Sequence, residues 1–173
     1  MPFSSRLLCA LALTLSILAP CAALAEPSTI YLVRHAEKES GGKDPDLTAQ
    51  GQARAQNIAT ILHKTGIAHI FSTPYKRTMQ TAQALAQRSG VPVQSYDPAA
   101  PKLLVDRVKS LKGAVLVVGH SNTLTELVRL FGGVPGADIP ETEYDRLYQL
   151  VVDSSGAITT VLLTSPTPAP AAQ

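Results

Sequence analysis

Two of the four histidines in this 173-residue sequence stand directly after apolar segments rich in β-branched residues. His35 follows one such segment and is preceded by Arg34, and His120 follows a second segment far along the chain. This pattern is typical of buried strands that deliver a reactive side chain at their carboxyl ends. A third strand-to-helix segment, Phe71–Thr78, adds Arg77. Two imidazoles and two guanidiniums at one edge of a sheet predict a binding site for a dianion such as a phosphoryl group.

His35 is the predicted nucleophile of this site. A neutral imidazole, near its ordinary pKa of about 6.5, can attack phosphorus when its other nitrogen is held as a hydrogen-bond donor. The attack forms a phosphohistidine that water later hydrolyses. We expect Arg34 and Arg77 to hold phosphoryl oxygens bidentately, a geometry that lysine lacks. His120 is expected to contact a further oxygen as negative charge builds up on it.

Other polar residues near these segments permit more than one interpretation. Ser121, Asn122 and Thr123 open the last predicted helix, and they could either donate hydrogen bonds to a substrate or only cap the helix. His63 lies within a predicted helix and His69 begins a predicted strand. Both are predicted to be structural or surface residues.

Three motifs share one pattern, a polar cluster directly after a predicted strand. They are Leu32-Val33-Arg34-His35-Ala36-Glu37-Lys38, Ser72-Thr73-Pro74-Tyr75-Lys76-Arg77-Thr78 with Gln80-Thr81-Ala82, and Val118-Gly119-His120-Ser121-Asn122-Thr123. Together they resemble the histidine phosphatase superfamily, which includes phosphoglycerate mutases and many phosphatases. The similarity extends from about residue 29 to residue 152. It implies that His35 accepts the phosphoryl group, that Arg34, Arg77 and His120 surround that group, and that no metal or other cofactor is obligatory.

The residue that would protonate the leaving oxygen departs from the family's pattern. Family members that act on phosphate esters often carry a glutamate after the third strand, where this sequence offers only Asp97. Asp97 is therefore the predicted general acid, although an aspartate before a proline in a loop is also ordinary turn chemistry. Glu37, Asp44 and Asp46 are alternatives on the first loop. Without any acid, substrates with good leaving groups are favoured, including phosphoramidates such as phosphohistidine.

The elements that must position these residues alternate between strand and helix. Strands are predicted at 29–33, 68–71, 91–96 and 115–118, helices at 49–65, 75–89, 102–111 and 123–131, and a hairpin at 147–152 and 157–163. Thr48 is the expected N-cap of the first helix, and Gly66 and Gly90 are expected just past the ends of the first and second helices. This order predicts an α/β fold, a three-layer α/β/α sandwich whose central sheet is mostly parallel, with the antiparallel hairpin at one edge. The segment 115–118 is wholly apolar and is therefore predicted to be a central strand.

The first 25 residues are predicted to be a signal peptide. Leu7–Ala19 is an apolar run of the length that a signal peptide uses, and it is too short to span a bilayer. Ala23-Leu24-Ala25 is typical of a cleavage site, so the mature chain would begin at Glu26. A lipid-modified Cys21 is the alternative. We therefore expect an exported protein, periplasmic or secreted, without stable membrane insertion after cleavage.

The rest of the chain is predicted to hold one domain, residues 26–164, followed by a disordered proline- and alanine-rich tail, residues 165–173. Both cysteines, Cys9 and Cys21, lie in the predicted leader, so the mature chain would have neither a disulfide nor a zinc-thiolate site. The full chain has 15 basic and 13 acidic residues, and this balance gives no indication of nucleic-acid binding.

A metal-independent phosphatase is the function that these observations favour. Its expected substrates are phosphorylated small molecules, envelope phosphosugars or phosphoproteins. A phosphoglycerate mutase-type phosphotransferase is one alternative, but the short segment after Tyr96 leaves little chain to exclude water. A non-catalytic phosphate- or phosphosugar-binding module is another, and it would not need His35 as a nucleophile. A serine hydrolase is disfavoured because no histidine follows Ser121, and a metallohydrolase because the arginines would repel the cation.

Overall fold

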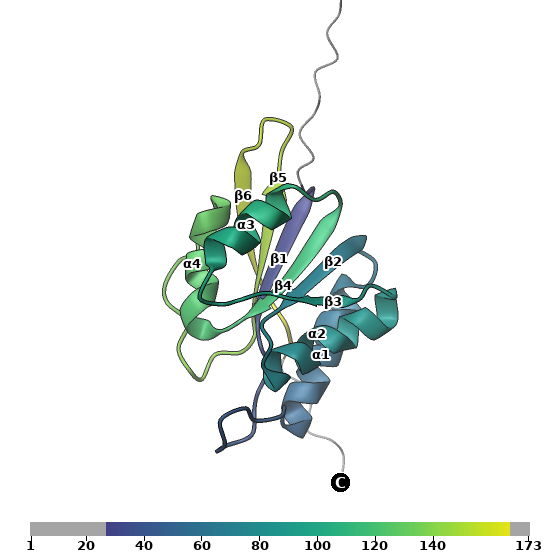
Figure 1. The fold of residues 1–173 in the computed structure, drawn as a ribbon, viewed down its shortest axis with the longest axis vertical. Helices are drawn as coiled ribbons and strands as arrows, with labels where there is room; N and C mark the ends of the chain where they lie inside the picture. The colour runs from purple at the N-terminus through teal and green to yellow at the C-terminus, as the bar shows by residue number, and fades with distance from the viewer. Residues whose placement is uncertain (1–26, 167–173) are drawn as a thin grey trace, which may run out of the picture.

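The computed structural model of this protein describes residues 27–166. In that part of the chain six strands form one sheet in the order β3-β2-β4-β1-β5-β6, accompanied by four helices (Figure 1). The strands are β1 (Thr29–Arg34), β2 (Ile67–Ser72), β3 (Val93–Ser95), β4 (Ala114–Gly119), β5 (Arg146–Val152) and β6 (Ile158–Thr164). The helices are α1 (Ala49–Leu62), α2 (Lys76–Ser89), α3 (Pro101–Lys109) and α4 (Ser121–Phe131).

The sheet is mostly parallel, with an antiparallel hairpin at its edge. β1 pairs in parallel with β4, β4 with β2, and β2 with β3, whereas β5 runs antiparallel to both β1 and β6. The predicted fold class is therefore confirmed. In the register, Arg34 lies beside Gly119 and Ser72 lies beside Val118. The carboxyl ends of β1, β4 and β2 consequently meet at one edge, where α/β folds bind their ligands.

Each face of the sheet packs against its own pair of helices. Tyr31 and Val33 of β1 belong to the apolar cluster that includes α1 and α2, whereas Ile30 and Leu32 belong to the cluster that includes α3 and α4. Every residue of β4 is buried, as expected for a central parallel strand. A slip of one residue would move each side chain to the opposite face, so the two cores fix the strand register.

The helix ends follow local signals in the sequence. Thr48 caps α1, because its Oγ1 accepts a hydrogen bond from the backbone N–H of Gly51 at 3.0 Å. α2 ends at Gly90, whose φ of 72° lies in the left-handed region that glycine adopts without strain. The sequence therefore predicted both of these ends correctly.

Several boundaries differ from the predicted ones, and α1 ends at Leu62 rather than near residue 66. β3 covers only Val93–Ser95 rather than residues 91–96, and Pro92, which lacks a backbone N–H, lies just before it. α4 begins at Ser121, two residues before its predicted start, because His120 occupies the N-cap position.

Arg54 of α1 connects three segments that are distant in sequence. Its Nε and Nη2 donate to the carboxylate of Glu37 at 2.6–3.0 Å, and its Nη1 donates to the carbonyl and hydroxyl oxygens of Ser165 at 3.0 and 3.1 Å. Ser165 is only 2% exposed, so the packed chain extends beyond the predicted boundary at residue 164. The remainder of the predicted tail from residue 167, and the predicted signal peptide, lie outside the described residues.

The described helices are too short or too polar for a membrane span: between residues 27 and 166 none could cross a bilayer.

The first turn of α1 lies against the loop that follows His35. A Cβ built on Gly51 would lie 2.0 Å from the backbone oxygen of Glu37. Helix propensity alone favours alanine over glycine by about 1 kcal/mol, but this contact forces a backbone shift that costs about 1–3 kcal/mol. We expect Gly51→Ala to lower the free energy of unfolding in a urea titration. Gln52→Ala, at an exposed neighbouring position, is the control, and a more stable Gly51→Ala protein would contradict the packing described here.

Candidate active site

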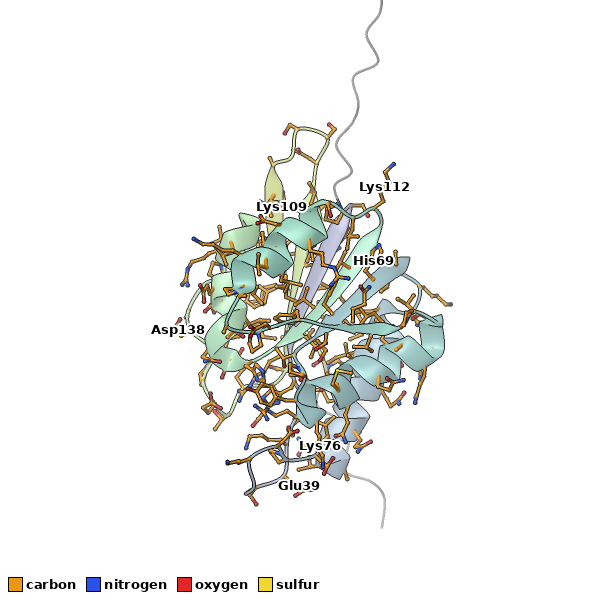
Figure 2. All side chains as sticks on the ribbon, viewed as in Figure 1. Glu39, His69, Lys76, Lys109, Lys112 and Asp138 are labelled. Carbon is orange, nitrogen blue, oxygen red and sulfur yellow. The ribbon has the colours of Figure 1, made fainter. Side chains whose placement is uncertain are left out.

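A cleft of about 600 Å³ lies at the carboxyl edge of the parallel strands. Figure 2 shows Lys76 and Glu39 at this lower end of the molecule, with Lys109, Lys112 and His69 away from it. The cleft is lined by residues from the β1, β2 and β4 ends and from the loop before β5, namely His35, Lys38, Lys43, Tyr75, Arg77, Pro98, His120, Ser121, Asn122, Thr123 and Glu141.

His35 is held at the end of β1 with one ring nitrogen already used. Its backbone N–H donates to the carbonyl of Gly119 at 2.9 Å, which continues the β1–β4 pairing by one residue. Its Nδ1 lies 2.8 Å from the carbonyl oxygen of Ala36. Because a carbonyl can only accept, Nδ1 carries the proton and Nε2 carries the lone pair. This tautomer is the one that a nucleophilic histidine requires.

His120 is the partner of His35 across the cleft. The two ring centroids are 5.4 Å apart. His120 Nε2 lies 3.0 Å from Thr73 Oγ1, which lies 2.8 Å from Thr78 Oγ1, and Thr78 donates its proton to backbone carbonyls. In this series of hydrogen bonds Thr78 gives its proton to a carbonyl oxygen and Thr73 gives its proton to Thr78. Nε2 of His120 must therefore donate to Thr73 Oγ1. His120 is therefore fixed as a hydrogen-bond donor.

Both histidine rings are neutral at pH 7. Burial lowers the pKa of His35 from 6.5 to about 4, and the nearby charges of Arg34 and Arg77 act in the same direction. Burial likewise lowers the pKa of His120 to about 4, again with contributions from Arg77 and Arg34. Burial, assisted by the cationic surroundings, therefore keeps the lone pair of His35 unprotonated at neutral pH.

Arg34 lies beneath the cleft instead of lining it. Its side chain is 1% exposed, and its Nη1 donates to the carbonyl oxygens of Pro140, Glu141 and Glu143 at 2.8–3.0 Å. Its Nη2 donates to the carboxylate of Glu141 at 2.6 Å. Both terminal nitrogens of Arg34 are thus bound to the loop before β5, so they do not form the expected bidentate contact here. Only Nε of Arg34 has no partner.

Arg77 lies in the first turn of α2 and lines the cleft directly. Its guanidinium lies 4.7 Å from the centroid of the Tyr75 ring, and its Nη1 is 3.6 Å from Asp44 Oδ1. Its Nε is buried and has no hydrogen-bond partner. Among the described residues, this Nε and that of Arg34 are the buried side-chain polar atoms without a partner. Both belong to the arginines that the sequence singled out.

The first turn of α4 borders the cleft. Ser121, Asn122 and Thr123 all line it, so the structure places them where they could contact a ligand as well as begin the helix. A helix N-terminus favours a bound anion, because its first backbone N–H groups have no partner within the helix. Ser121 Oγ donates to Glu141 Oε1 at 2.5 Å.

The acids that the sequence offered do not line the cleft. Asp97 is exposed, and its Oδ1 accepts from the backbone N–H of Ala99 at 2.9 Å, as in an ordinary turn. Glu37 is paired with Arg54. Asp44 accepts from the backbone N–H of Lys76 at the start of α2, and Asp46 accepts from side chains of α2. The structure therefore does not bring Asp97 together with His35.

Glu141 is the acid that the structure places in the cleft. It lies in the loop between α4 and β5, where the sequence shows glycines and prolines but no motif. Lys38 and Lys43 also line the cleft and were not predicted. Lys38 is the last residue of the first motif, so its position offered a signal. His63 and His69 lie outside the cleft lining, in agreement with their predicted structural or surface roles.

No group of three or more His, Cys, Asp or Glu side chains within residues 27–166 is arranged to hold a metal ion.

Comparison with known proteins agrees with this geometry. The family model of the histidine phosphatase superfamily (branch 1) matches residues 30–98, which contain His35 and Arg77. The resemblance to this superfamily is confirmed. The Escherichia coli protein named "Probable phosphoglycerate mutase GpmB" is 32% identical over 126 residues, which are 66% of this chain and 54% of GpmB. The chain thus spans about half the length of this relative.

Solved structures share the fold over most of this chain. The protein histidine phosphatase SixA, complexed with tungstate, gives a TM-score of 0.60 at 19% identity and covers 79% of this chain and 97% of its own. A mycobacterial glucosyl-3-phosphoglycerate phosphatase gives a TM-score of 0.56 at 15% identity, with coverage of 79% and 97%. At these identities the likeness establishes the fold.

The depressed pKa values of His35 and His120, each about 4, make stability depend on pH. In the unfolded chain a histidine has a pKa of about 6.5, so between about pH 6.5 and pH 4 the unfolded state binds more protons than the folded state. We expect the free energy of unfolding to fall as pH falls through this interval. Ring titration by NMR should place both midpoints near pH 4. A midpoint near 6.5 for either ring would contradict the assigned environment.

Proposed function

We propose that this protein is a phosphatase that hydrolyses phosphomonoesters or phosphoramidates through a phosphohistidine at His35. The observation that carries the proposal is the pair of buried, unpartnered guanidinium N–H groups of Arg34 and Arg77 beside a neutral His35. Leaving a buried charged donor without a partner is costly. A phosphoryl group bound here would accept from both, and it would lie next to the imidazole that attacks it.

The proposed chemistry uses the cleft residues in two steps. Nε2 of His35 attacks phosphorus while the bond to the leaving oxygen or nitrogen breaks, and the leaving group takes its proton from solvent water. Arg77, the Nε of Arg34 and the first turn of α4 stabilise the charge on the phosphoryl oxygens. Water then attacks the phosphohistidine, the P–N bond breaks, and inorganic phosphate leaves. The electron pair of that bond returns to His35.

Hydrolysis is favoured over transfer to a second substrate. A mutase must keep water away from the phosphoenzyme until the second transfer. In this chain only residues 96–100 connect β3 to α3. This short connection supports a cleft with little covering structure on that side, in which water competes successfully for the phosphohistidine.

The first test is to trap the phosphoenzyme. We expect rapid acid-free quenching during turnover of a labile phosphate ester to leave an acid-labile phosphate on His35, which mass spectrometry can map. His35→Ala should lose activity by at least about 10³-fold, because removing a nucleophile leaves only binding and electrostatic catalysis. Phosphate bound without any turnover would instead identify a binding module. Label on a serine would contradict the proposal.

We further propose that the reaction needs no metal, because Arg77, Lys38 and Lys43 in the cleft and Arg34 beneath it already supply positive charge. A chelator such as EDTA should leave the hydrolysis of nitrophenyl phosphate unchanged, whereas oxyanions that mimic phosphate, such as vanadate, should inhibit it. A loss of activity with EDTA that one divalent cation restores would overturn this part of the proposal.

The proposed substrates are phosphorylated small molecules, envelope phosphosugars or phosphoproteins. Two structural neighbours are named as a protein histidine phosphatase and a glucosyl-3-phosphoglycerate phosphatase, and these names support a screen that includes phosphohistidine and phosphosugars. We also propose that the protein is exported. N-terminal sequencing of protein from the cell envelope should begin at Glu26, while lipid on Cys21 would indicate an anchored form and a retained Met1 would contradict export.

A further inference from the structure

We propose that Glu141 is the general base that activates the water which hydrolyses the phosphohistidine. This inference rests on the proposed function. In the step, the water oxygen forms a bond to phosphorus, one water proton passes to the carboxylate of Glu141, and the P–N bond to His35 breaks. The bonding pair returns to the imidazole, and inorganic phosphate is released.

The geometry places this carboxylate in the cleft and makes it accessible to water. Glu141 lines the same cleft as His35 and His120, and its side chain is 76% exposed. Nη2 of Arg34 holds one carboxylate oxygen at 2.6 Å, and the hydroxyl of Ser121 holds the other at 2.5 Å. Each oxygen has a second lone pair that can accept from water. A carboxylate fixed at two points keeps its orientation toward the cleft.

The charge state of Glu141 suits a base. The hydrogen bond from Ser121 lowers its pKa, and the charge and hydrogen bond of Arg34 lower it further. Cationic Lys38, Lys43 and Arg77 line the same cleft. At neutral pH the carboxylate is therefore ionised, so it can take up a proton but has none to give. This assigns Glu141 to the hydrolysis of the phosphoenzyme, in which water must lose a proton.

The other acids near the site are not available for this role. Glu37 is bound by Arg54, Asp97 accepts from a turn N–H, and Asp44 accepts from the first N–H of α2. None of the three lines the cleft. Nε2 of His120 donates its proton to Thr73 Oγ1, so it has no lone pair with which to take a proton from water.

The test separates the two steps by the choice of substrate. Nitrophenolate leaves without needing a proton, so nitrophenyl phosphate should phosphorylate His35 at the normal rate in Glu141→Gln. The phosphohistidine should then persist, because loss of a general base slows its step by about 10²-fold or more. Stopped-flow absorbance should show a burst of about one nitrophenolate per enzyme, followed by slow turnover. Glu126→Gln, on the exposed face of α4 and outside the cleft lining, is the matched control and should turn over like wild type.

A second variant tests the chemistry independently of the glutamine substitution. In Glu141→Ala, added formate should accelerate loss of phosphate from the isolated phosphoenzyme, because a small base can enter the space of the missing carboxylate. A merely structural role for Glu141 would show no rescue.

The outcomes are distinguishable. Normal steady-state turnover in Glu141→Gln, or equal slowing of the burst and of the later phase, would overturn the role of Glu141 while leaving a phosphohistidine mechanism intact. Absence of any phosphohistidine in the wild-type enzyme would overturn the proposed function itself.

Discussion

The parallel pairing of β1 with β4 is the constraint on which the site depends. This register sets Arg34 beside Gly119, and the next residue of each strand is a histidine. The backbone N–H of His35 extends the ladder by donating to Gly119, so both rings leave adjacent strands at the same level, with centroids 5.4 Å apart. Because two apolar cores lock the register, the histidines cannot slip relative to each other without exposing buried side chains. The relative position of the two histidine rings is thus a consequence of core packing.

The electrostatics of the cleft follow from that placement. Two neutral rings lie among cationic side chains, and the same burial that excludes water from His35 lowers its pKa to about 4. The arrangement is unfavourable for an imidazolium, and each arginine keeps a buried Nε without a partner. Under the proposed function, a bound oxyanion would supply the partners that these two donors lack. Burial and positive charge therefore act together to keep His35 neutral.

The sequence predicted the fold and the cationic half of the site, and it missed the acidic half, for a physical reason. His35 and His120 follow strands directly, and Arg77 lies in the first turn of the helix that follows β2. Their positions are therefore set near strand ends, and strands can be recognised from apolar, β-branched runs. Glu141 lies in a long loop whose path is set by tertiary contacts, the hydrogen bonds from Arg34 to three of its carbonyl oxygens. No local pattern encodes contacts between residues more than a hundred positions apart. Asp97 lies after β3, where the family's acid is expected, but its carboxylate accepts from the backbone N–H of a local turn, so its role as general acid stays a prediction.

Arg34 lies next to His35 in sequence and also holds the loop that carries Glu141. One guanidinium holds three carbonyls through Nη1 and a carboxylate through Nη2, and it still has Nε unpartnered. Tyr144 lies against its face, 4.2 Å from the guanidinium carbon to the ring centroid. A lysine offers a single nitrogen and no planar face, so it could not reproduce this set of contacts. Arg34 thus holds in place the loop that carries Glu141, while its own Nε stays without a partner beside His35.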